Sequence, residues 1–256
     1  MTQSIVTFPQ LGMHGRFGNQ LFQIAATLAH ARHVGCEVRF RWEAWNPLYL
    51  HLGILARWFS LEEEVGPPYF AGWNYEPIPD HARALYGYYQ SPKFWGGECP
   101  LRVVGAVGKE RVVAHFRGGD YRVLQDFHPV LPVSYYQEAL RIERVSRGAM
   151  VSEEAVNIPG FQWGGRFSLW TDFRRMLSAE VLVISNSTLA LWAAYLGRAK
   201  TIYYPQPWFG PELLAHDETQ LIPEVSEKVW IGIPYKDITM TFDTTRWSER
   251  WEVKSR

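Results

Sequence analysis

Residues 4–35 read SIVTFPQLGMHGRFGNQLFQIAATLAHARHVG, and this stretch decides the fold class. A short apolar run over 4–8 predicts a strand, and a glycine-rich loop follows it. Apolar side chains then recur on one face of a predicted helix over 19–33, which Asn19 is placed to cap and Gly35 to end. A strand, a glycine-rich loop and a helix in this order indicate an α/β fold.

The same alternation continues along the chain and indicates parallel sheets. Further strands are expected over 37–42, 84–90, 111–116, 180–184 and 201–204. Helices are expected over 134–147, 168–178 and 187–196, with a short one over 48–58 and a glycine-containing loop between the first two.

Glycines cluster between residues 96 and 108, and the hydrophobic periodicity lapses there. We therefore expect a junction in this region. It divides an N-terminal lobe over 1–105 from a C-terminal lobe over 106–235. The remaining residues, 236–256, are expected to form a C-terminal extension.

The 256 residues include 26 basic and 26 acidic side chains, so the formal net charge is zero, and 47% of the residues are hydrophobic. This composition excludes a mostly disordered chain. The balanced charge argues against a nucleic-acid partner bound by bulk electrostatics. Cys36 and Cys99 are expected to be reduced thiols. Residues 1–10 show no signal peptide, and no apolar run reaches the roughly 18 residues that cross a membrane. We expect a cytoplasmic protein, at most peripheral to a membrane.

Three loops, at 15–20, 115–121 and 185–188, combine glycines, hydroxyls or amides at the end of a predicted strand. A helix start presents unpaired N–H groups and a partial positive charge, which suit phosphate oxygens. In open α/β sheets such loops lie outside the carboxyl ends of the strands, where ligands bind. Each loop also has a plainer explanation, because glycines serve tight turns and Ser-Asn-Ser is an ordinary helix cap.

Arg117 emerges at the end of a predicted buried strand, beside Gly118 and Gly119. Its guanidinium is suited to holding a phosphate through two parallel hydrogen bonds. The alternative is a structural ion pair with Asp120 or another carboxylate. The sequence leaves both interpretations open.

Several nucleotide-binding and metal-binding signatures are absent from the sequence. The glycines at 12, 15 and 18 are spaced G-x-x-G-x-x-G, which is not the dinucleotide fingerprint G-x-G-x-x-G. Neither a P-loop motif nor an Asp-x-Asp pair occurs. We therefore expect neither a metal ion nor another cofactor.

Three segments resemble the α-1,2-fucosyltransferases of glycosyltransferase family 11. Residues 15–23, GRFGNQLFQ, are similar to that family's N-terminal G-x-x-G-N-Q-L-F-Q segment. Residues 115–121, HFRGGDY, resemble its H-x-R-R-G-D-Y motif, and Tyr135-Tyr136 resembles the tyrosine pair that follows. Residues 184–196 resemble its later block around N-S-[ST]. The matches come in the family's order between about residues 5 and 230.

The chain departs from the family pattern at two places. Gly118 stands where H-x-R-R-G-D has its second arginine, which removes a positive charge from the expected donor site. The family's strand ending in F-S-D-D is not found between Arg141 and Ser178, and that stretch is expected to be shortened. Both departures bear on which sugar nucleotide is recognised.

The resemblance implies a GT-B-like fold in which two Rossmann-like lobes face a cleft. It implies inverting, metal-independent transfer of L-fucose from GDP-fucose, the donor, to a hydroxyl of a glycan acceptor, with the C-terminal lobe on the donor side. Arg117 is then the catalytic cation that neutralises the leaving diphosphate. The donor-binding residues implied are His115, Arg117, Gly118, Gly119, Asn186, Ser187, Thr188, Gly15, Arg16 and Asn19.

An inverting transfer needs a group that takes the proton of the acceptor hydroxyl. Asp126, in a stretch without a regular pattern, is the first candidate for this base. Asp120 belongs to the motif and is expected to hold its loop. Another carboxylate, His14 or the diphosphate itself are further routes for the proton. The aromatic residues Trp73, Tyr75, Tyr88, Tyr89 and Trp95 are candidates for an acceptor groove or for ordinary core.

Two other functions remain open at this point. One is a related glycosyltransferase with a different nucleotide-sugar donor, because Gly118 and the missing segment relax the fucosyl pattern. The other is a non-catalytic relative that binds a glycan or a nucleotide on the same scaffold. A screen of GDP-fucose, GDP-mannose and UDP-sugars separates these possibilities.

Overall fold

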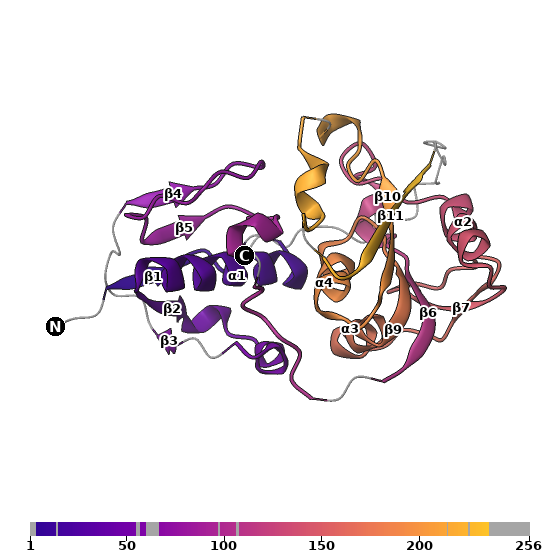
Figure 1. The fold of residues 1–256 in the computed structure, drawn as a ribbon, viewed down its shortest axis with the longest axis horizontal. Helices are drawn as coiled ribbons and strands as arrows, with labels where there is room; N and C mark the ends of the chain where they lie inside the picture. Colours follow the sequence, from indigo (N-terminus) through magenta and orange to yellow (C-terminus); the bar gives the residue numbers. More distant parts are fainter. Residues whose placement is uncertain are drawn as a thin grey trace, which may run out of the picture.

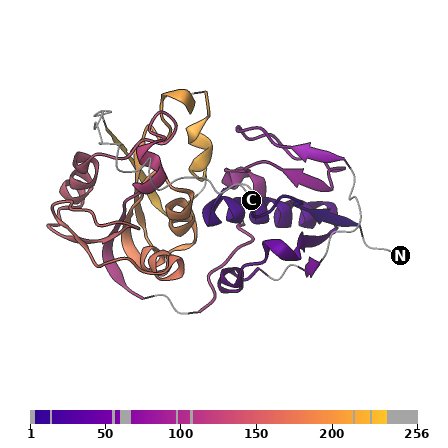
Figure 2. The same cartoon turned by 180° about the vertical axis from the view of Figure 1, so that it is seen from behind.

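The computed structural model describes residues 4–13, 15–54, 57–59, 67–96, 98–105, 108–213, 215–224 and 226–235. Within them the chain forms an α/β fold with two sheets, and every strand pair in both sheets is parallel. The α/β fold class is thereby confirmed. Figures 1 and 2 show the two sheets in opposite halves of an elongated molecule.

The first sheet has the strand order β3-β2-β1-β5-β4, with β1 at its centre. Its strands are β1 (Ile5–Thr7), β2 (Glu37–Arg41), β3 (Arg57–Phe59), β4 (Pro68–Phe70) and β5 (Ala84–Tyr86). The glycine-rich loop and α1 (Phe17–Val34) connect β1 to β2, as the opening stretch predicts. Gly35 ends α1 in the left-handed conformation expected of it.

The prediction of a short helix over 48–58 is wrong for the second half of that range. A 3-10 helix spans Pro47–Leu52, and Gly53 ends it with a φ of 66°. Residues Arg57–Phe59 then form β3, which pairs with β2. A short apolar run fits both a helix pattern and a strand pattern. Here the end of the run forms a strand, because it pairs with β2 at the edge of the first sheet.

The second sheet has the order β11-β10-β9-β6-β7-β8. The expected strands appear as β6 (Glu110–His115), β9 (Ala179–Val183) and β10 (Thr201–Gln206), and β11 (Val229–Pro234) is an addition. The expected helices appear as α2 (Val133–Glu143), α3 (Leu169–Leu177) and α4 (Thr188–Leu196). Short 3-10 helices elsewhere span Trp42–Ala44, Pro92–Trp95, Gly119–Arg122, Pro211–Leu213 and Glu218–Leu221.

The stretch between Arg141 and Ser178 contains two strands that the sequence pattern missed, β7 (Gly148–Val151) and β8 (Phe161–Trp163). β7 pairs with β6 and runs into Ser152, Glu153 and Glu154. The sequence F-S-D-D is absent from this stretch, as expected, but the stretch does contain a strand followed by two glutamates. The strand was missed because four residues are too few to show a period of two.

The hydrophobic core is continuous between the two sheets, because α1 packs against α4. Phe22 of α1 lies 4.9 Å from Trp192 of α4, and the Trp95 ring lies 5.3 Å from Trp192, centroid to centroid. Phe22 and Trp192 belong to one buried cluster that also contains Val6 and Leu182 from the two sheets, and the partly buried Trp95 packs against it. The expected division at residue 105 and the GT-B arrangement stay predictions, and the expected extension 236–256 lies outside the described residues.

The second contact between the halves is polar. Gln220 donates to the carbonyl of Trp73 at 2.9 Å, and the backbone N–H of Asp217 donates to Asn74 Oδ1 at 2.9 Å. The hydroxyl of Ser91 donates to the carbonyl of Gln220, also at 2.9 Å.

Cys36 and Cys99 are free thiols. Among the described helices, none has the length and apolar character that a bilayer-spanning segment needs.

Candidate functional site

A cavity of about 310 Å³ lies where the loops after β1, β6 and β9 meet, at the carboxyl ends of these strands. The loops come from segments far apart in the sequence, and they belong to both sheets. Nine predicted site residues line this cavity. They are eight of the predicted donor residues and one predicted acid: Gly15, Arg16, Asn19, His115, Arg117, Asn186, Ser187, Thr188 and Asp120.

Two helix N-termini border this cavity, and neither has a capping side chain or an acidic residue that would offset its partial positive charge. α1 begins at Phe17 and α4 at Thr188, and neither Arg16 nor Ser187 makes a side-chain cap. Neither helix has an acidic residue in its first turn. The exposed N–H groups and the helix dipoles therefore give both ends a partial positive charge that suits an anion.

Gly18 allows these two helix ends to approach one another. A β-carbon on Gly18 would lie 2.5 Å from the backbone nitrogen of Leu189 and 2.5 Å from Thr188 Oγ1. No side chain fits in that space, because the backbone of α4 cannot yield as a flexible side chain can. The glycine in the first predicted loop thus has a packing role between the two halves.

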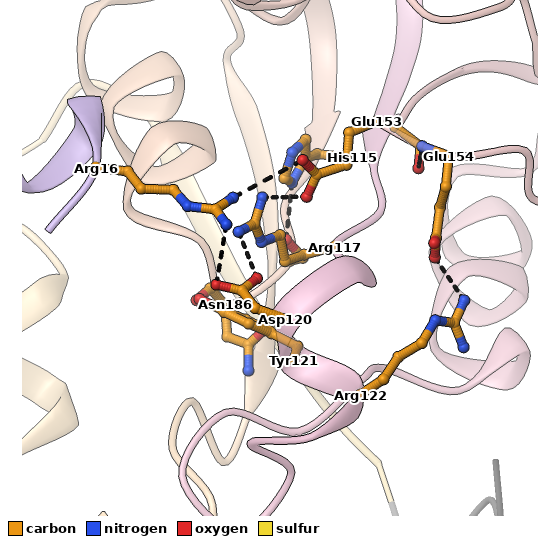
Figure 3. A network of polar contacts seen from close by, with 11 residues as sticks. Arg16, His115, Arg117, Asp120, Tyr121, Arg122, Glu153, Glu154 and Asn186 are labelled. Atoms are coloured by element: carbon orange, nitrogen blue, oxygen red, sulfur yellow. Dashed lines mark hydrogen bonds and ion pairs between the residues drawn. The ribbon is translucent and has the colours of Figure 1, made fainter. Parts of the chain in front are cut away.

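Arg117 lies at the centre of a charge network (Figure 3). Its side chain is 13% exposed, and Nη2 donates to Asp120 Oδ1 at 2.6 Å, while Nη1 donates to Glu153. Arg16 reaches the same two carboxylates, with Nη2 3.3 Å from Asp120 Oδ2 and Nη1 3.8 Å from Glu153 Oε2. The ion pair considered for Arg117 therefore exists, and two cations and two carboxylates balance in the cavity wall.

Glu153 is a site residue that sequence reasoning missed. It follows β7, and it lines the cavity beside Arg16 and Arg117, with which it forms ion pairs. The signal that could have identified it is the pair Glu153-Glu154, which comes directly after an apolar run and Ser152.

Gly118 and Gly119 belong to the same loop but do not line the cavity. A β-carbon on Gly118 would lie 1.8 Å from Glu154 Oε1 and 3.0 Å from Phe116 Cε1. Glu154 is held in that place by Arg122, whose Nη2 donates to Oε1 at 2.5 Å. The space beside residue 118 is therefore filled by a carboxylate and not left open.

His115 is buried and neutral. Its Nδ1 lies 2.8 Å from Ser185 Oγ, and Tyr136 donates its hydroxyl to the His115 carbonyl at 3.1 Å. Burial, together with the nearby charge of Arg117, lowers the pKa of His115 to about 3. Ser185 is only 1% exposed and is not among the cavity-lining residues. The His115–Ser185 pair therefore holds the strand ends together and offers no accessible nucleophile.

Two buried polar atoms of cavity-lining residues have no hydrogen-bond partner within the described part of the chain. Asn186 donates Nδ2 to the carbonyl of Pro129 at 3.0 Å, which leaves its Oδ1 unsatisfied. His128 Nδ1 is also unsatisfied. Native proteins rarely leave buried acceptors without a donor. Both atoms therefore suit a ligand that supplies hydroxyl or N–H groups.

His128 was not predicted from the sequence, and no local pattern singles it out. Its ring stacks on Tyr121 at 5.0 Å and packs at an angle against Phe209 at 6.4 Å, centroid to centroid. Burial lowers the pKa of His128 below its usual value. The lowered pKa favours the neutral imidazole, which is the form that a general base must have before it takes a proton.

Asp126, the first candidate for the base, does not line the cavity. It is exposed, and its carbonyl accepts the backbone N–H of Glu212 at 2.9 Å. A β-carbon on Gly210 would lie 2.4 Å from the same carbonyl, so this loop packs tightly through its backbone. His14, the other side chain considered for the proton, lies outside the described residues.

The five aromatic residues considered for an acceptor groove are not gathered around the cavity. Tyr89 is 1% exposed and belongs to the core, and the partly buried Trp95 packs against the core through Trp192. Trp73 is 47% exposed and lies between Tyr88 and His216, with centroid distances of 4.6 Å and 4.7 Å. Only part of the expected set is therefore available to a glycan.

No family model, curated protein or solved structure matches this chain. Among the described residues, no group of three or more His, Cys, Asp or Glu side chains is arranged to hold a metal ion.

Proposed function

We propose that this chain is an inverting, metal-independent glycosyltransferase that moves L-fucose from GDP-fucose to a glycan hydroxyl, by an α-1,2 linkage to galactose. One observation supports the proposal above the others. The loops at 15–19, 115–121 and 186–188, which resemble three separate motifs of such enzymes, contribute to one cavity. That convergence is expected of ligand-binding loops and is not required of loops that only turn the chain.

The diphosphate of the donor is proposed to bind between the two helix N-termini and Arg117. Glu153 is 40% exposed at its side chain, against 13% for Arg117, and exposed ion pairs are weak. We expect the diphosphate to displace Glu153 from Arg117 Nη1, while Asp120 keeps Nη2 in place. The guanidinium then offsets the negative charge that grows on the leaving phosphate.

In the transfer step, the acceptor hydroxyl oxygen forms a bond to the anomeric carbon as the bond from that carbon to the β-phosphate oxygen breaks. The electron pair of the broken bond leaves with GDP. We assign the hydroxyl proton to the His128 imidazole, because this residue lines the cavity, its Nδ1 has no partner within the described part of the chain, and Asp126 does not line the cavity. Asn186 Oδ1 would orient a sugar hydroxyl or a base N–H beside it.

A second candidate function is the same reaction with another sugar nucleotide. The observation that favours it is the carboxylate of Glu154, which fills the space beside Gly118 where the resembling motif has a second arginine. This local exchange of a cation for an anion disfavours a donor that needs both arginines.

A donor screen by hydrolysis and transfer tests the proposal. Purified protein is incubated in EDTA with GDP-fucose, GDP-mannose or UDP-sugars, and free GDP or UDP is measured. The proposal predicts turnover of GDP-fucose, tighter binding of GDP than of ADP or UDP, and no gain from magnesium. Turnover of another donor supports the second candidate, while GDP affinity that disappears in EDTA contradicts the metal-independent reaction.

A further inference from the structure

A second cavity, of about 950 Å³, lies at the other end of the larger sheet. Its lining includes the starts of β6 and β7, at Glu110 and Gly148, whereas the candidate site lies beyond the ends of β6 and β9. The two cavities therefore lie at opposite ends of β6, the strand that they share and that Figure 1 labels. The second cavity therefore cannot belong to the candidate site.

The lining of this second cavity is strongly basic. Five cationic side chains, Lys109, Arg111, Arg144, Arg147 and Arg175, surround it with a single carboxylate, Glu110. The chain as a whole has no formal net charge, so this concentration of positive charge is a local feature. An adjoining hollow of about 370 Å³ shares Lys109, Glu110 and Arg175.

Most of these cations lack an acidic partner. Arg175 Nε donates to Glu110 Oε1 at 3.0 Å, which uses the only carboxylate of the lining. Within the described part of the chain, Lys109, Arg111, Arg144 and Arg147 form no ion pair. The candidate site behaves differently, because its arginines are matched by carboxylates. Like charges around a concave surface repel one another and raise the local affinity for anions.

Helix ends explain only part of the pattern. Arg144 is the C-terminal cap of α2, and Arg175 lies in the last turn of α3, where cations interact well with the helix dipole. Lys109, Arg111 and Arg147 lie outside the helices, so no dipole accounts for them. Arg144 also holds a left-handed backbone with a φ of 54°, a position that usually belongs to glycine or asparagine.

We infer that this second cavity binds a ligand that carries several phosphate groups. Guanidinium groups match phosphate oxygens in a planar, two-bonded geometry, and three of the four unpaired cations are arginines. The cations come from separate segments around a volume at the upper end of the roughly 300–1,000 Å³ of small-molecule sites. One phosphate could not contact all of them, but a chain of phosphates or a group of lipid headgroups could.

The inference does not depend on the proposed transferase activity, and binding measurements test it directly. Sodium tripolyphosphate is titrated into the protein by calorimetry at low salt. The test variant is Arg111→Gln/Arg147→Gln, and the matched control is Arg32→Gln/Arg102→Gln, which removes the same charge from exposed positions in the N-terminal half. Arg117→Ala removes the contribution of the candidate site, and thermal melts confirm that each variant folds.

We expect tripolyphosphate to bind the wild type, the control and Arg117→Ala with similar affinity, and to bind the test variant at least tenfold more weakly. Sedimentation with vesicles of phosphatidylglycerol, against phosphatidylcholine alone, identifies the source of the phosphate. Vesicle binding that depends on Arg111 and Arg147 assigns the cavity to lipid headgroups, and tripolyphosphate binding alone assigns it to a free polyphosphate compound. An equal loss in the test and control variants, or binding to neither probe, overturns the inference.

Discussion

Arg16 Nη2 lies 3.3 Å from Asp120 Oδ2, so a side chain from the loop before α1 reaches a carboxylate from the loop after β6. The pair joins the two halves of the molecule in the wall of the candidate site (Figure 3). Arg16 is 56% exposed at its side chain, and exposed pairs contribute about 0–1 kcal/mol to stability. The pair can therefore open for a ligand without loss of the fold, which the buried core between α1 and α4 maintains.

Gly18→Ala tests the contact between the two helix ends. We expect the free energy of unfolding to fall by about 1–3 kcal/mol, because the added methyl group meets the backbone of Leu189 and Thr188. GDP affinity should fall as well, since the helix ends must separate. Gly72→Ala is the matched control, because a β-carbon there meets nothing within 4 Å. Equal melting temperatures for the two variants would contradict the packing role of Gly18.

The lowered pKa of His115 predicts that the folded state loses stability in acid. Its pKa is about 3 in the folded chain, against 6.5 for an unperturbed histidine. Between these values the unfolded state binds more protons, so stability falls as the pH drops below 6.5 and this contribution levels off near pH 3. The slope should approach about 1.4 kcal/mol per pH unit. Denaturant titrations between pH 7 and 4 should show a shallower slope for His115→Gln than for the wild type.

A slope that is unchanged in His115→Gln would mean that other groups cause the loss of stability in acid.

Gly118→Arg tests whether the space beside this residue is filled. We expect weaker GDP binding and a lower melting temperature, because the new side chain must displace Glu154 from Arg122. Adding Glu154→Ala to Gly118→Arg should restore part of the GDP affinity, since the obstructing carboxylate is then gone. Tighter GDP binding by Gly118→Arg alone would show instead that the position is an open gap.

His128→Gln tests the route of the proton. We expect kcat to fall about 100-fold or more while GDP affinity and the melting temperature change little, because the ring accepts a proton only during transfer. Asp126→Asn is the comparison, and it should keep near-normal kcat because Asp126 does not line the cavity. The opposite result, with only Asp126→Asn inactive, would return the role of base to Asp126.

The strongly periodic and glycine-marked parts of the sequence predicted the fold well. The helix expected over 19–33 appears as Phe17–Val34, and the strand expected over 111–116 appears as Glu110–His115. β7 and β8 were missed, because strands of three or four residues show no period and depend on their neighbours for hydrogen bonds.

The same distinction holds for the candidate site. Its loops were predicted because glycines and polar side chains follow apolar strands. Glu153 and His128 were not, since their place in the cavity depends on how β7 and the loop after Arg122 pack in three dimensions. Asp126 and Tyr89 are the opposite case. A carboxylate suited the role of base and an aromatic ring suited an acceptor groove, but Asp126 is exposed away from the cavity and Tyr89 is buried in the core.

The central claim is that Arg117 stabilises the leaving diphosphate of a sugar nucleotide. Its most direct test is kcat/KM for GDP-fucose, measured in EDTA for the wild type, Arg117→Ala and Arg117→Lys, with thermal melts to confirm folding. We predict a fall of about 100-fold or more for Arg117→Ala, and little recovery for Arg117→Lys, which lacks the two-bonded geometry. Near-normal turnover by a folded Arg117→Ala variant, or no turnover of GDP-fucose by the wild type, would contradict the claim.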